Sequence, residues 1–428
     1  IRRPPRSTPL YSSAASDVYK RQIKDNSMTA DTIAEESDSI NGAFRKGYER
    51  LFEKQWPIWI GGLLLGIGNV FLFAFDRPWT VSNGVRNWGD WLFNEIGLIQ
   101  INVLPPNIFS SSVLCFGMII GSLAAALLGR QFQVRMAPAR ELFKGLFGGA
   151  LMGIGAALAF GCNIGGFFSA ISALSMAGVA MMFGLGIGAF VGLKLLIWEI
   201  EYLPATSWGA QKVPKVDNTS GASSKAQPIA GFVILLLSIP LMLTYDAFDY
   251  SVTGGFLLFG LLIGIVMQRS RFCFVRAFRD PFMTGDAEAT KAVVLAVIIS
   301  VTGFTILKWT DLRSWDVAVQ PGFWIGSLMG GIIFGIGMSF SGGCASGTIW
   351  RAGEGQVKLW VTLVTFALST SYFREWLVSS GLRSRLGEEL FLPDVIGWKM
   401  ALIIIIAIMF LWYFLAVWNG ISKKLVVV

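Results

Sequence analysis

The chain alternates between long hydrophobic runs and short polar segments. Each run contains about 20 apolar residues, enough for a helix to cross a hydrocarbon core of about 30 Å. The segment 76–108 instead mixes Trp79, Trp88 and Trp91 with polar residues, and we expect it to lie at the membrane interface. The pattern predicts about ten membrane-spanning helices, at 57–75, 109–129, 143–160, 179–198, 230–245, 252–268, 290–308, 322–340, 357–373 and 395–418. We therefore predict an all-α polytopic membrane protein with about 9–11 transmembrane helices.

Polar segments divide the chain further. Residues 1–22 hold five Lys or Arg and one Asp without an apolar core, so they are not a signal peptide. We interpret them as a non-native translated adapter, with Met28 as the candidate start of the native protein. Residues 23–56 are predicted to form a polar tail with a short amphipathic helix. The rest divides into a first membrane half at 57–198, a linker rich in Pro, Ser and Lys at 199–229, and a second membrane half at 230–428.

Composition narrows the class of protein. Of the 428 residues, 54% are hydrophobic and 14% are charged, whereas a soluble domain has about 25% charged residues. The net charge of +8 is explained by residues 1–22 and by ordinary cytoplasmic loops, so the lipid bilayer is expected as surroundings and nucleic acid is not expected as a partner. The sequence has no His, no C-x-x-C pair and no P-loop. We therefore predict that the protein is not an enzyme and that it holds no metal or other cofactor.

The sequence contains an internal repeat. Residues 149–165 read GALMGIGAALAFGCNIG and residues 331–347 read GIIFGIGMSFSGGCASG, sharing the pattern G-x3-G-x-G-x5-G-C-x2-G. A second match, between 116–121 and 259–264, has a shorter offset, and we interpret the span at 290–308 as an insertion in the second half. Two related halves are typical of carriers with a central substrate site. The arginines that follow the matching spans leave the relative orientation of the halves open.

The two Gly-Cys motifs are candidate substrate sites. Glycines are poor residues for a straight helix interior, so a broken or re-entrant helix is expected at each motif. A helix that begins after the break offers free N–H groups to an anion, with the thiol beside it. The alternative is close helix packing, with cysteine as a small apolar residue. The candidate residues are Gly161, Cys162, Asn163 and Gly165 in the first motif and Gly343, Cys344 and Gly347 in the second.

A third cysteine lies in an arginine-rich segment. Cys273 stands in MQRSRFCFVRAFRDPF, and Arg271 and its neighbours would attract anions and favour a reactive thiol. The alternative is an ordinary cytoplasmic loop. Its first-half counterpart is expected at 130–135, which has no cysteine.

Other polar residues at the span ends are expected to have structural roles. We expect Arg351 to pair with Glu354, and we assign only weak roles to Asp280, Glu354 and Glu141. Cys115, in the middle of a span, is expected to be a packing residue.

Three motifs resemble those of the YeeE/YedE sulphur-transport family of bacterial inner-membrane proteins. They are MQRSRFCFVRAFRD, SGGCASGTIWRAGEG and GIGAALAFGCNIGG, and the resemblance extends from about Phe52 to the C-terminus. It implies thiosulfate import along a path on which the thiols of Cys162, Cys273 and Cys344 hold the terminal sulfur through S–H···S hydrogen bonds. It also implies a TusA-like sulfur-carrier protein as a cytoplasmic partner. The order of the halves matches the YedE-like branch, and Phe160 and Asn163 depart from the familiar motif.

The leading hypothesis is a transporter for thiosulfate or a related sulfur anion. A selenium compound is an alternative substrate. A permease for a soft metal such as Cu(I) is a second alternative, because thiols bind thiophilic ions. A membrane thiol oxidoreductase is a third, and a purely structural subunit a fourth. Soft thiols with arginines fit a soft anion better than a hard cation such as Mg²⁺, which prefers oxygen ligands.

Overall fold

The computed structural model describes residues 40–202 and 221–427. The interpretations of residues 1–22 and Met28, and the middle of the predicted linker, lie outside the described residues. The chain divides into two units, with the boundary after Lys54. The described part of the first unit is a helix, α2 (Ile40–Tyr48), followed by a π-helical turn, η1 (Glu49–Glu53).

In the described residues of the second unit, the regular elements are all helices, joined by loops, and the β-type pairing is limited to two isolated bridges. Within these residues, nine helical spans are long and apolar enough to cross a membrane. This confirms the predicted all-α polytopic fold. The nine spans are Ile58–Phe75, Ser110–Leu128, Ala139–Ser172, Met176–Tyr202, Ala226–Ala247, Ser251–Met283, Glu288–Trp309, Ile325–Gly353 and Trp398–Ser422.

Three of these spans contain a break. The span Ala139–Ser172 consists of α6 (Ala139–Leu158), η2 (Asn163–Phe168) and α7 (Ser169–Ser172). The span Ile325–Gly353 consists of α13 (Ile325–Ser341) and α14 (Ala345–Gly353). The span Ser251–Met283 consists of α10 (Ser251–Ser270) and α11 (Phe274–Met283). A cysteine lies at each break, as the sequence predicted for two of them.

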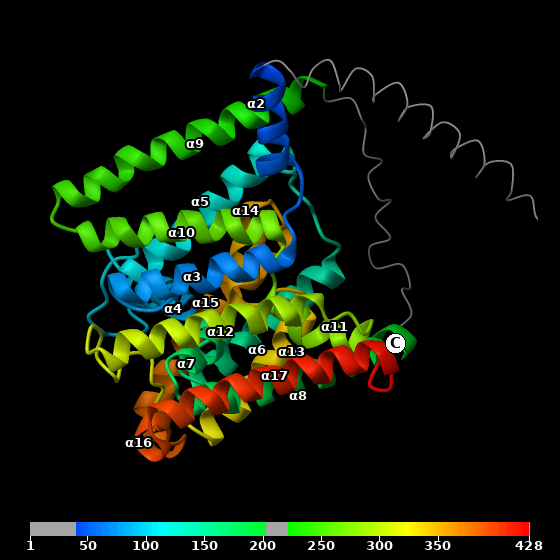
Figure 1. Ribbon diagram of the computed structural model, residues 1–428. Coiled ribbons are helices and arrows are strands. Elements are labelled where there is room, and N and C mark those ends of the chain that lie inside the picture. The colour runs from blue at the N-terminus through cyan, green and yellow to red at the C-terminus, as the bar shows by residue number, and fades with distance from the viewer. Residues whose placement is uncertain (1–39, 203–220, 428) are drawn as a thin grey trace, which may run out of the picture. The chain divides into compact units, whose positions relative to one another are not determined.

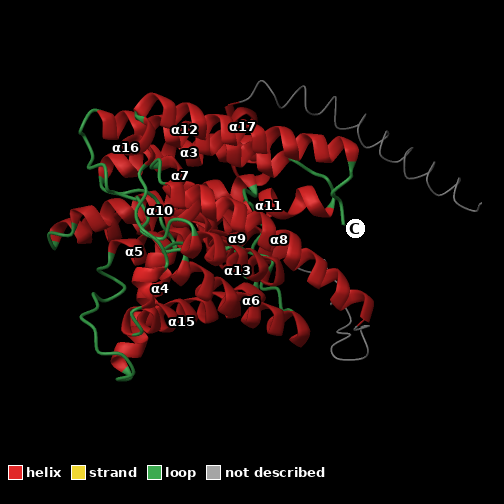
Figure 2. Ribbon diagram, turned by 90° about the horizontal axis from the view of Figure 1, so that it is seen from below, coloured by secondary structure: helices red, strands yellow, loops and turns green. Residues whose placement is uncertain are grey.

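The remaining helices complete the bundle. They are α3 (Ile58–Phe75), α4 (Ser82–Glu95), α5 (Ser110–Leu128), α8 (Met176–Tyr202), α9 (Gly221–Ala247), α12 (Glu288–Trp309), α15 (Val357–Ser379), η3 (Leu382–Arg385), α16 (Leu392–Ile396) and α17 (Trp398–Ser422). α9, α10, α3, α12 and α17 lie side by side in that order (Figure 1). Seen from below, α12 and α17 lie toward one edge and α6 and α15 toward the other, with α13 and α8 between them (Figure 2).

The two halves have the same order of elements. The series α3, α4, α5, α6, η2–α7 and α8 corresponds to α10, α11, α12, α13, α14 and α15, while α9 and α17 stand outside the repeat. α12 therefore corresponds to α5, and the interpretation of the span at 290–308 as an insertion is wrong. The second sequence match arose for another reason. The glycines of this match lie where α5 and α10 pack against each other. A Cβ added at Gly117 would lie 3.0 Å from Gly260 Cα, and a Cβ added at Gly260 would lie 3.0 Å from Gly117 Cα.

The halves are inverted with respect to each other. α6 and its counterpart α13 run in opposite directions, since Gly148 faces Gly337 whereas Gly155 faces Gly330. This is the inverted-repeat arrangement found in many secondary transporters. The contacts between α6 and α13 therefore settle the relative orientation of the two halves, which the arginine pattern left open.

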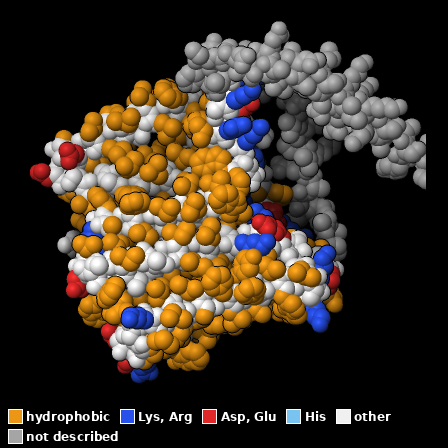
Figure 3. Space-filling view, viewed as in Figure 1, with side chains coloured by type: hydrophobic (Ala, Val, Ile, Leu, Met, Phe, Trp, Pro, Cys, Tyr) orange, Lys and Arg blue, Asp and Glu red, His pale blue; other side chains and the backbone are white. Residues whose placement is uncertain are grey.

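The two ends of the second unit differ in charge. At one end, here called the basic end, α5 and α8 finish and α6 and α15 begin, joined by ion pairs such as Arg140–Glu199 at 2.8 Å. The described basic residues there are Arg130, Arg135, Arg140, Lys144, Arg269, Arg271, Arg276, Arg279, Lys291, Arg351, Lys358, Lys423 and Lys424. The opposite end is richer in acids, namely Asp76, Asp90, Glu95, Asp246, Asp249, Asp311, Asp316, Glu375, Glu388, Glu389 and Asp394. Hydrophobic side chains cover the face between the two ends (Figure 3).

Candidate functional site

The two predicted Gly-Cys breaks have matching backbone geometry. Cys162 caps η2 and accepts a hydrogen bond from Ile164 N at 3.4 Å, and Cys344 caps α14 and accepts one from Gly347 N at 3.4 Å. The chain reverses before each cysteine through a residue of positive φ, Phe160 in the first half and Gly342 in the second. Each thiol therefore lies at a helix N-terminus, where backbone N–H groups favour negative charge.

Cys273 and Cys344 lie together at the basic end. Cys273 is the residue before α11, and its side chain is 1% exposed, while that of Cys344 is fully buried. A Cβ added to Gly347 would lie 3.3 Å from Cys344 Sγ and 3.8 Å from Cys273 Sγ. The absence of a side chain at Gly347 thus leaves a small space that both sulfur atoms face. The predicted residues Cys273, Cys344 and Gly347 are brought together, and we call them the two-thiol site.

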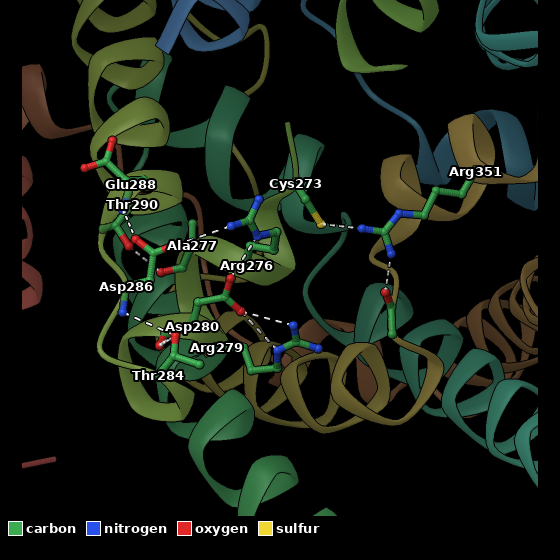
Figure 4. Close-up of polar contacts among 11 residues, drawn as sticks. Cys273, Arg276, Ala277, Arg279, Asp280, Thr284, Asp286, Glu288, Thr290 and Arg351 are labelled. Atoms are coloured by element: carbon green, nitrogen blue, oxygen red, sulfur yellow. Dashed lines mark hydrogen bonds and ion pairs between the residues drawn. The ribbon is translucent and has the colours of Figure 1, made fainter. Parts of the chain in front are cut away.

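Arg351 extends from α14 to the two-thiol site. Its Nη2 lies 3.9 Å from Cys273 Sγ and its Nη1 donates to Gly342 O at 2.8 Å (Figure 4). The predicted pair between Arg351 and Glu354 is therefore wrong. Sequence reasoning also missed the role of Arg351, although it stands seven residues after Cys344, a spacing that returns to the same helix face.

Glu354 is instead the centre of a buried polar network. Arg271 Nη1 lies 2.6 Å from Glu354 Oε1, and Gln268 donates to the same oxygen at 2.9 Å. Both Arg271 and Gln268 also donate to Gln131 Oε1. Glu354 is 1% exposed, so its charge needs these partners. Arg271, predicted to bind substrate, lies beside this carboxylate. The side chains that approach the thiols are Arg351, beside Cys273, and Ser346, whose Oγ lies 3.5 Å from Cys344 Sγ.

The other arginines around Cys273 are also paired. Arg276 and Arg279 contact Asp280 at 2.8 Å and 3.0 Å, and Arg276 lies 3.4 Å from Asp286 (Figure 4). Asp280 thus organises α11, which makes its role larger than the sequence suggested. Glu141 is likewise a structural partner, at 2.6 Å from Lys358.

The surroundings of Cys162 contain hydroxyl groups instead of a second thiol. Cys162 N donates to Ser82 Oγ at 3.2 Å. A Cβ added to Gly165 would lie 3.5 Å from Thr80 Oγ1 and 3.9 Å from Ser82 Oγ. In the repeat, α4 corresponds to α11, and the residue before α4 is Val81. Val81 therefore stands where Cys273 stands in the other half, and the expected counterpart at 130–135 is wrong, because that segment follows α5 instead.

A cavity adjoins Thr80 and Gly165, at the end of the second unit opposite the basic end. It has a volume of about 160 Å³, and polar side chains line it together with Gly165. Burial lowers the pKa of Arg77, while Asp76 opposes the shift, and a guanidinium remains protonated throughout the physiological range. The side chains most relevant to an anion are Arg77, Thr80, Asn83, Ser169 and Gln320.

Phe160 forms part of the wall of the same cavity, and Arg374 and Arg383 lie over its ring at 4.7 Å and 5.5 Å. Phe160, which departs from the familiar motif, thus holds two guanidinium groups near the cavity through cation–π contacts.

Two buried polar side chains next to the turns lack partners in the described structure. Both amide atoms of Asn163 are buried without a hydrogen bond, and so is Thr348 Oγ1, which lies beside Gly343. A buried polar group without a partner is costly, commonly by about 1–3 kcal/mol. Asn163 and Thr348 therefore have unused hydrogen-bonding capacity beside the turns.

Two further residues of the sequence analysis have packing contacts. Gly161 packs against Gly166 within the first turn. Cys115 is fully buried, and its Sγ lies 3.6 Å from Val81 O, so it packs against the start of α4.

A family model described as sulphur transport matches residues 18–191 and 269–426. The chain belongs to the sulphur transport family. Within this family, it is 30% identical over 313 residues to the probable transporter YedE of Escherichia coli K12, covering 69% of this chain and 75% of that protein. It is also 36% identical over 125 residues to the thiosulfate transporter TsuA of E. coli K12, covering 29% of this chain and 35% of TsuA. The TsuA of Spirochaeta thermophila is 36% identical over 126 residues, covering 28% and 38%.

All three turn cysteines lie within the matched residues of the sulphur transport family. Membership confirms the resemblance drawn from the three motifs. Together with the nine apolar spans, it identifies a multi-pass membrane protein of a transport family.

Proposed function

We propose that this protein carries thiosulfate, or a closely related sulfur anion, across a bacterial inner membrane along a path that passes Cys162, Cys344 and Cys273. The observation that carries the proposal is the two-thiol site, where sulfur atoms from two helix N-termini face the bare Cα of Gly347. The name of the TsuA relatives supports thiosulfate as the substrate.

The chemistry of the site fits this ion. Thiosulfate has a terminal sulfur, which a thiol S–H can contact, and three oxygens, which N–H and O–H groups can contact. An unpaired charge inside a protein is costly, so a passing anion needs donors at each step. Arg351 and the helix N-termini of η2 and α14 supply such donors. The buried carboxylates nearby are paired, Glu354 with Arg271 and Asp280 with Arg276 and Arg279.

Charge also suggests a direction. Loops rich in Lys and Arg face the cytoplasm in most membrane proteins. By this rule the basic end is cytoplasmic, and the cavity at Gly165 faces outward. The anion would then pass Cys162 first and the two-thiol site second. A TusA-like sulfur carrier would meet it at the basic end.

A permease for Cu(I) is disfavoured by one contact. The guanidinium of Arg351 lies 3.9 Å from Cys273 Sγ, and a cation held by the two thiols would be repelled by it. In the described residues, no group of three or more Cys, Asp or Glu is placed to hold a metal. A selenium analogue of thiosulfate has the same charge, so the same donors would accept it as an alternative substrate.

The test is sulfur-limited growth. The chain is expressed in a bacterium that lacks its own sulfate and thiosulfate uptake, with thiosulfate as the only sulfur source. We expect growth with the unchanged chain and with Cys115→Ala, and none with Cys344→Ala, because Cys115 lies outside the two-thiol site. Immunoblots of the membrane fraction control for expression. Growth of the Cys344→Ala strain at the unchanged rate would contradict the thiol path.

A further inference from the structure

A second binding feature lies away from the thiols, on the outer surface of the bundle. A groove of about 490 Å³ runs between α8, α11 and α17. Its walls are almost entirely apolar, and the side chain of its one amide residue, Asn419, is already bonded to Pro281 O at 2.7 Å and Leu425 N at 2.9 Å. The walls include Phe183, Ile187, Phe190, Phe278, Leu411 and Trp418.

The groove faces hydrocarbon rather than water. Its two long walls belong to α8 and α17, which are both long and apolar enough to cross a membrane. Several wall side chains are more than half exposed, among them Phe183 at 56% and Leu411 at 59%. In a bilayer, an apolar surface at this depth is covered by acyl chains.

Two lysines mark the basic-end rim of the groove. Lys194 Nζ lies 4.7 Å from the ring centroid of Phe190, and Lys424 Nζ lies 5.9 Å from that of Trp418, and both rings line the groove. Both lysines are exposed, and neither pairs with a carboxylate in the part of the chain that the structure describes. Lysines near helix ends extend to the headgroup layer, where each attracts anionic lipid.

We propose that this groove binds an anionic phospholipid, with an acyl chain between α8 and α17 and the phosphate at Lys194 and Lys424. Groove shape alone would accept any acyl chain, and the two lysines select an anionic headgroup.

The bound lipid would also bear on the two-thiol site. The floor of the groove is α11, and the residue before α11 is Cys273. Phe278 of α11 stacks on Trp412 of α17 at 4.8 Å, so a chain that fills the groove holds α11 against α17. The lipid would thereby fix the position of the Cys273 thiol. This consequence depends on the proposed transport function, whereas lipid binding does not.

Two kinds of variant distinguish recognition of the lipid headgroup from binding of the acyl chain in the groove. The double variant Lys194→Gln and Lys424→Gln removes the charges at exposed positions. Gly186→Leu fills the groove, because Gly186 lines it and a Cβ added there would meet no atom within 4 Å. Gly68→Leu is the matched control, since Gly68 of α3 also has nothing within 4 Å and lies outside the groove.

The measurement is native mass spectrometry of the full chain with added phosphatidylglycerol or phosphatidylcholine, checked by size exclusion for folding. We expect the unchanged chain and Gly68→Leu to retain phosphatidylglycerol preferentially. The double lysine variant should lose that preference by about tenfold, as expected for two lysines at the membrane surface. Gly186→Leu should lose both lipids. Equal retention of the two lipids by the unchanged chain, or retention by Gly186→Leu that matches Gly68→Leu, would overturn the proposal whatever the protein transports.

Discussion

The turn at Cys162 and the turn at Cys344 share a backbone but differ in what surrounds the thiol. In both, a cysteine caps a new helix and accepts an N–H at 3.4 Å. At Cys344, a second thiol, that of Cys273, approaches Gly347, and the guanidinium of Arg351 lies beside this second thiol. At Cys162, the hydroxyls of Thr80 and Ser82 take that place. The repeat therefore supplies the same helix-capping backbone twice, and a few side chains give each copy its own surroundings.

Along the proposed path, this difference would give an anion a gradient in binding strength. By the register of the repeat, Arg351 corresponds to Ser169, whose hydroxyl donates to Trp79 O at 2.7 Å. Next to Cys162 itself the donors are neutral and there is one thiol, with Arg77, Arg374 and Arg383 farther out around the adjoining cavity. At the other turn, a guanidinium lies directly beside one of two thiols. An anion would be bound more strongly at the second, which lies at the basic end. A symmetric pair of sites would give no such order.

The largest effect is expected from removal of the thiols that face Gly347. Cys344→Ala and Cys273→Ala should each lower thiosulfate uptake by about ten- to a hundredfold, the effect of losing a buried hydrogen-bonding partner. Radiolabelled thiosulfate uptake into whole cells measures it. Cys162→Ala should lower uptake too, and Cys115→Ala should leave it unchanged. Full uptake in all three turn variants would show that the thiols do not line the path.

The second-largest effect on uptake is expected from substitution of the glycine three residues after each cysteine, Gly347 or Gly165. Gly347→Ala should lower uptake nearly as much as Cys344→Ala, because its methyl group would lie 3.3 Å from Cys344 Sγ and occupy the space between the thiols. Gly165→Ala should lower uptake less, since its methyl group would make only ordinary contacts with Thr80, the shortest at 3.4 Å. Gly68→Ala tests for a general effect on helix stability, because a Cβ added there would meet no atom within 4 Å and Gly68 lies outside the groove. Equal losses from Gly347→Ala and Gly165→Ala would argue against different roles for the two turns.

Much of the fold could be predicted from local patterns, whereas the contacts of the site could not. Apolar runs fix membrane spans because the bilayer demands about 20 such residues, and glycines beside a cysteine fix a break because they weaken a helix. The contact of Arg351 with Cys273 joins residues 78 positions apart, and it depends on how α14 is aimed. The pair of Arg271 and Glu354 similarly joins α10 to α14.

The misaligned repeat has a different cause. Glycines at 117 and 121 match those at 260 and 264 because α5 and α10 press their glycine faces together. Close helix packing in membranes selects small residues at a spacing of four, whether or not the helices are counterparts. Spacing alone cannot distinguish shared origin from mutual contact.

The burial of Lys308 could not be predicted from the sequence either. Its ammonium group donates to Ala173 O at 3.1 Å and to Trp315 O at 2.7 Å, and Ala173 is 135 positions away in the chain.

A smaller effect on uptake is expected from substitution of Arg351, the charged residue whose counterpart at the first turn is the uncharged Ser169. Arg351→Gln should raise the concentration of thiosulfate for half-maximal uptake by about tenfold, because one charge-assisted contact is worth roughly 1.5–3 kcal/mol. Arg351→Lys should restore part of that loss, since it returns the charge without the fork that also reaches Gly342 O. Ser169→Ala, the counterpart change, should alter uptake less. If Arg351→Gln and Arg351→Lys behave alike, the residue acts through geometry and not charge.

The smallest effect should come from making the two turns more alike. Val81 is buried and stands where Cys273 stands in the other half, and cysteine is smaller than valine, so Val81→Cys should fit without strain. A second thiol near Gly165 should hold the anion longer at the first turn, so we expect the maximal rate and the half-saturating concentration both to fall, by about two- to threefold. Val85→Cys, one turn further along α4 and also buried, is the control for an added thiol as such. An unchanged rate in Val81→Cys would mean that the first turn is not a binding step, and the gradient between the turns would then have to arise from charge alone.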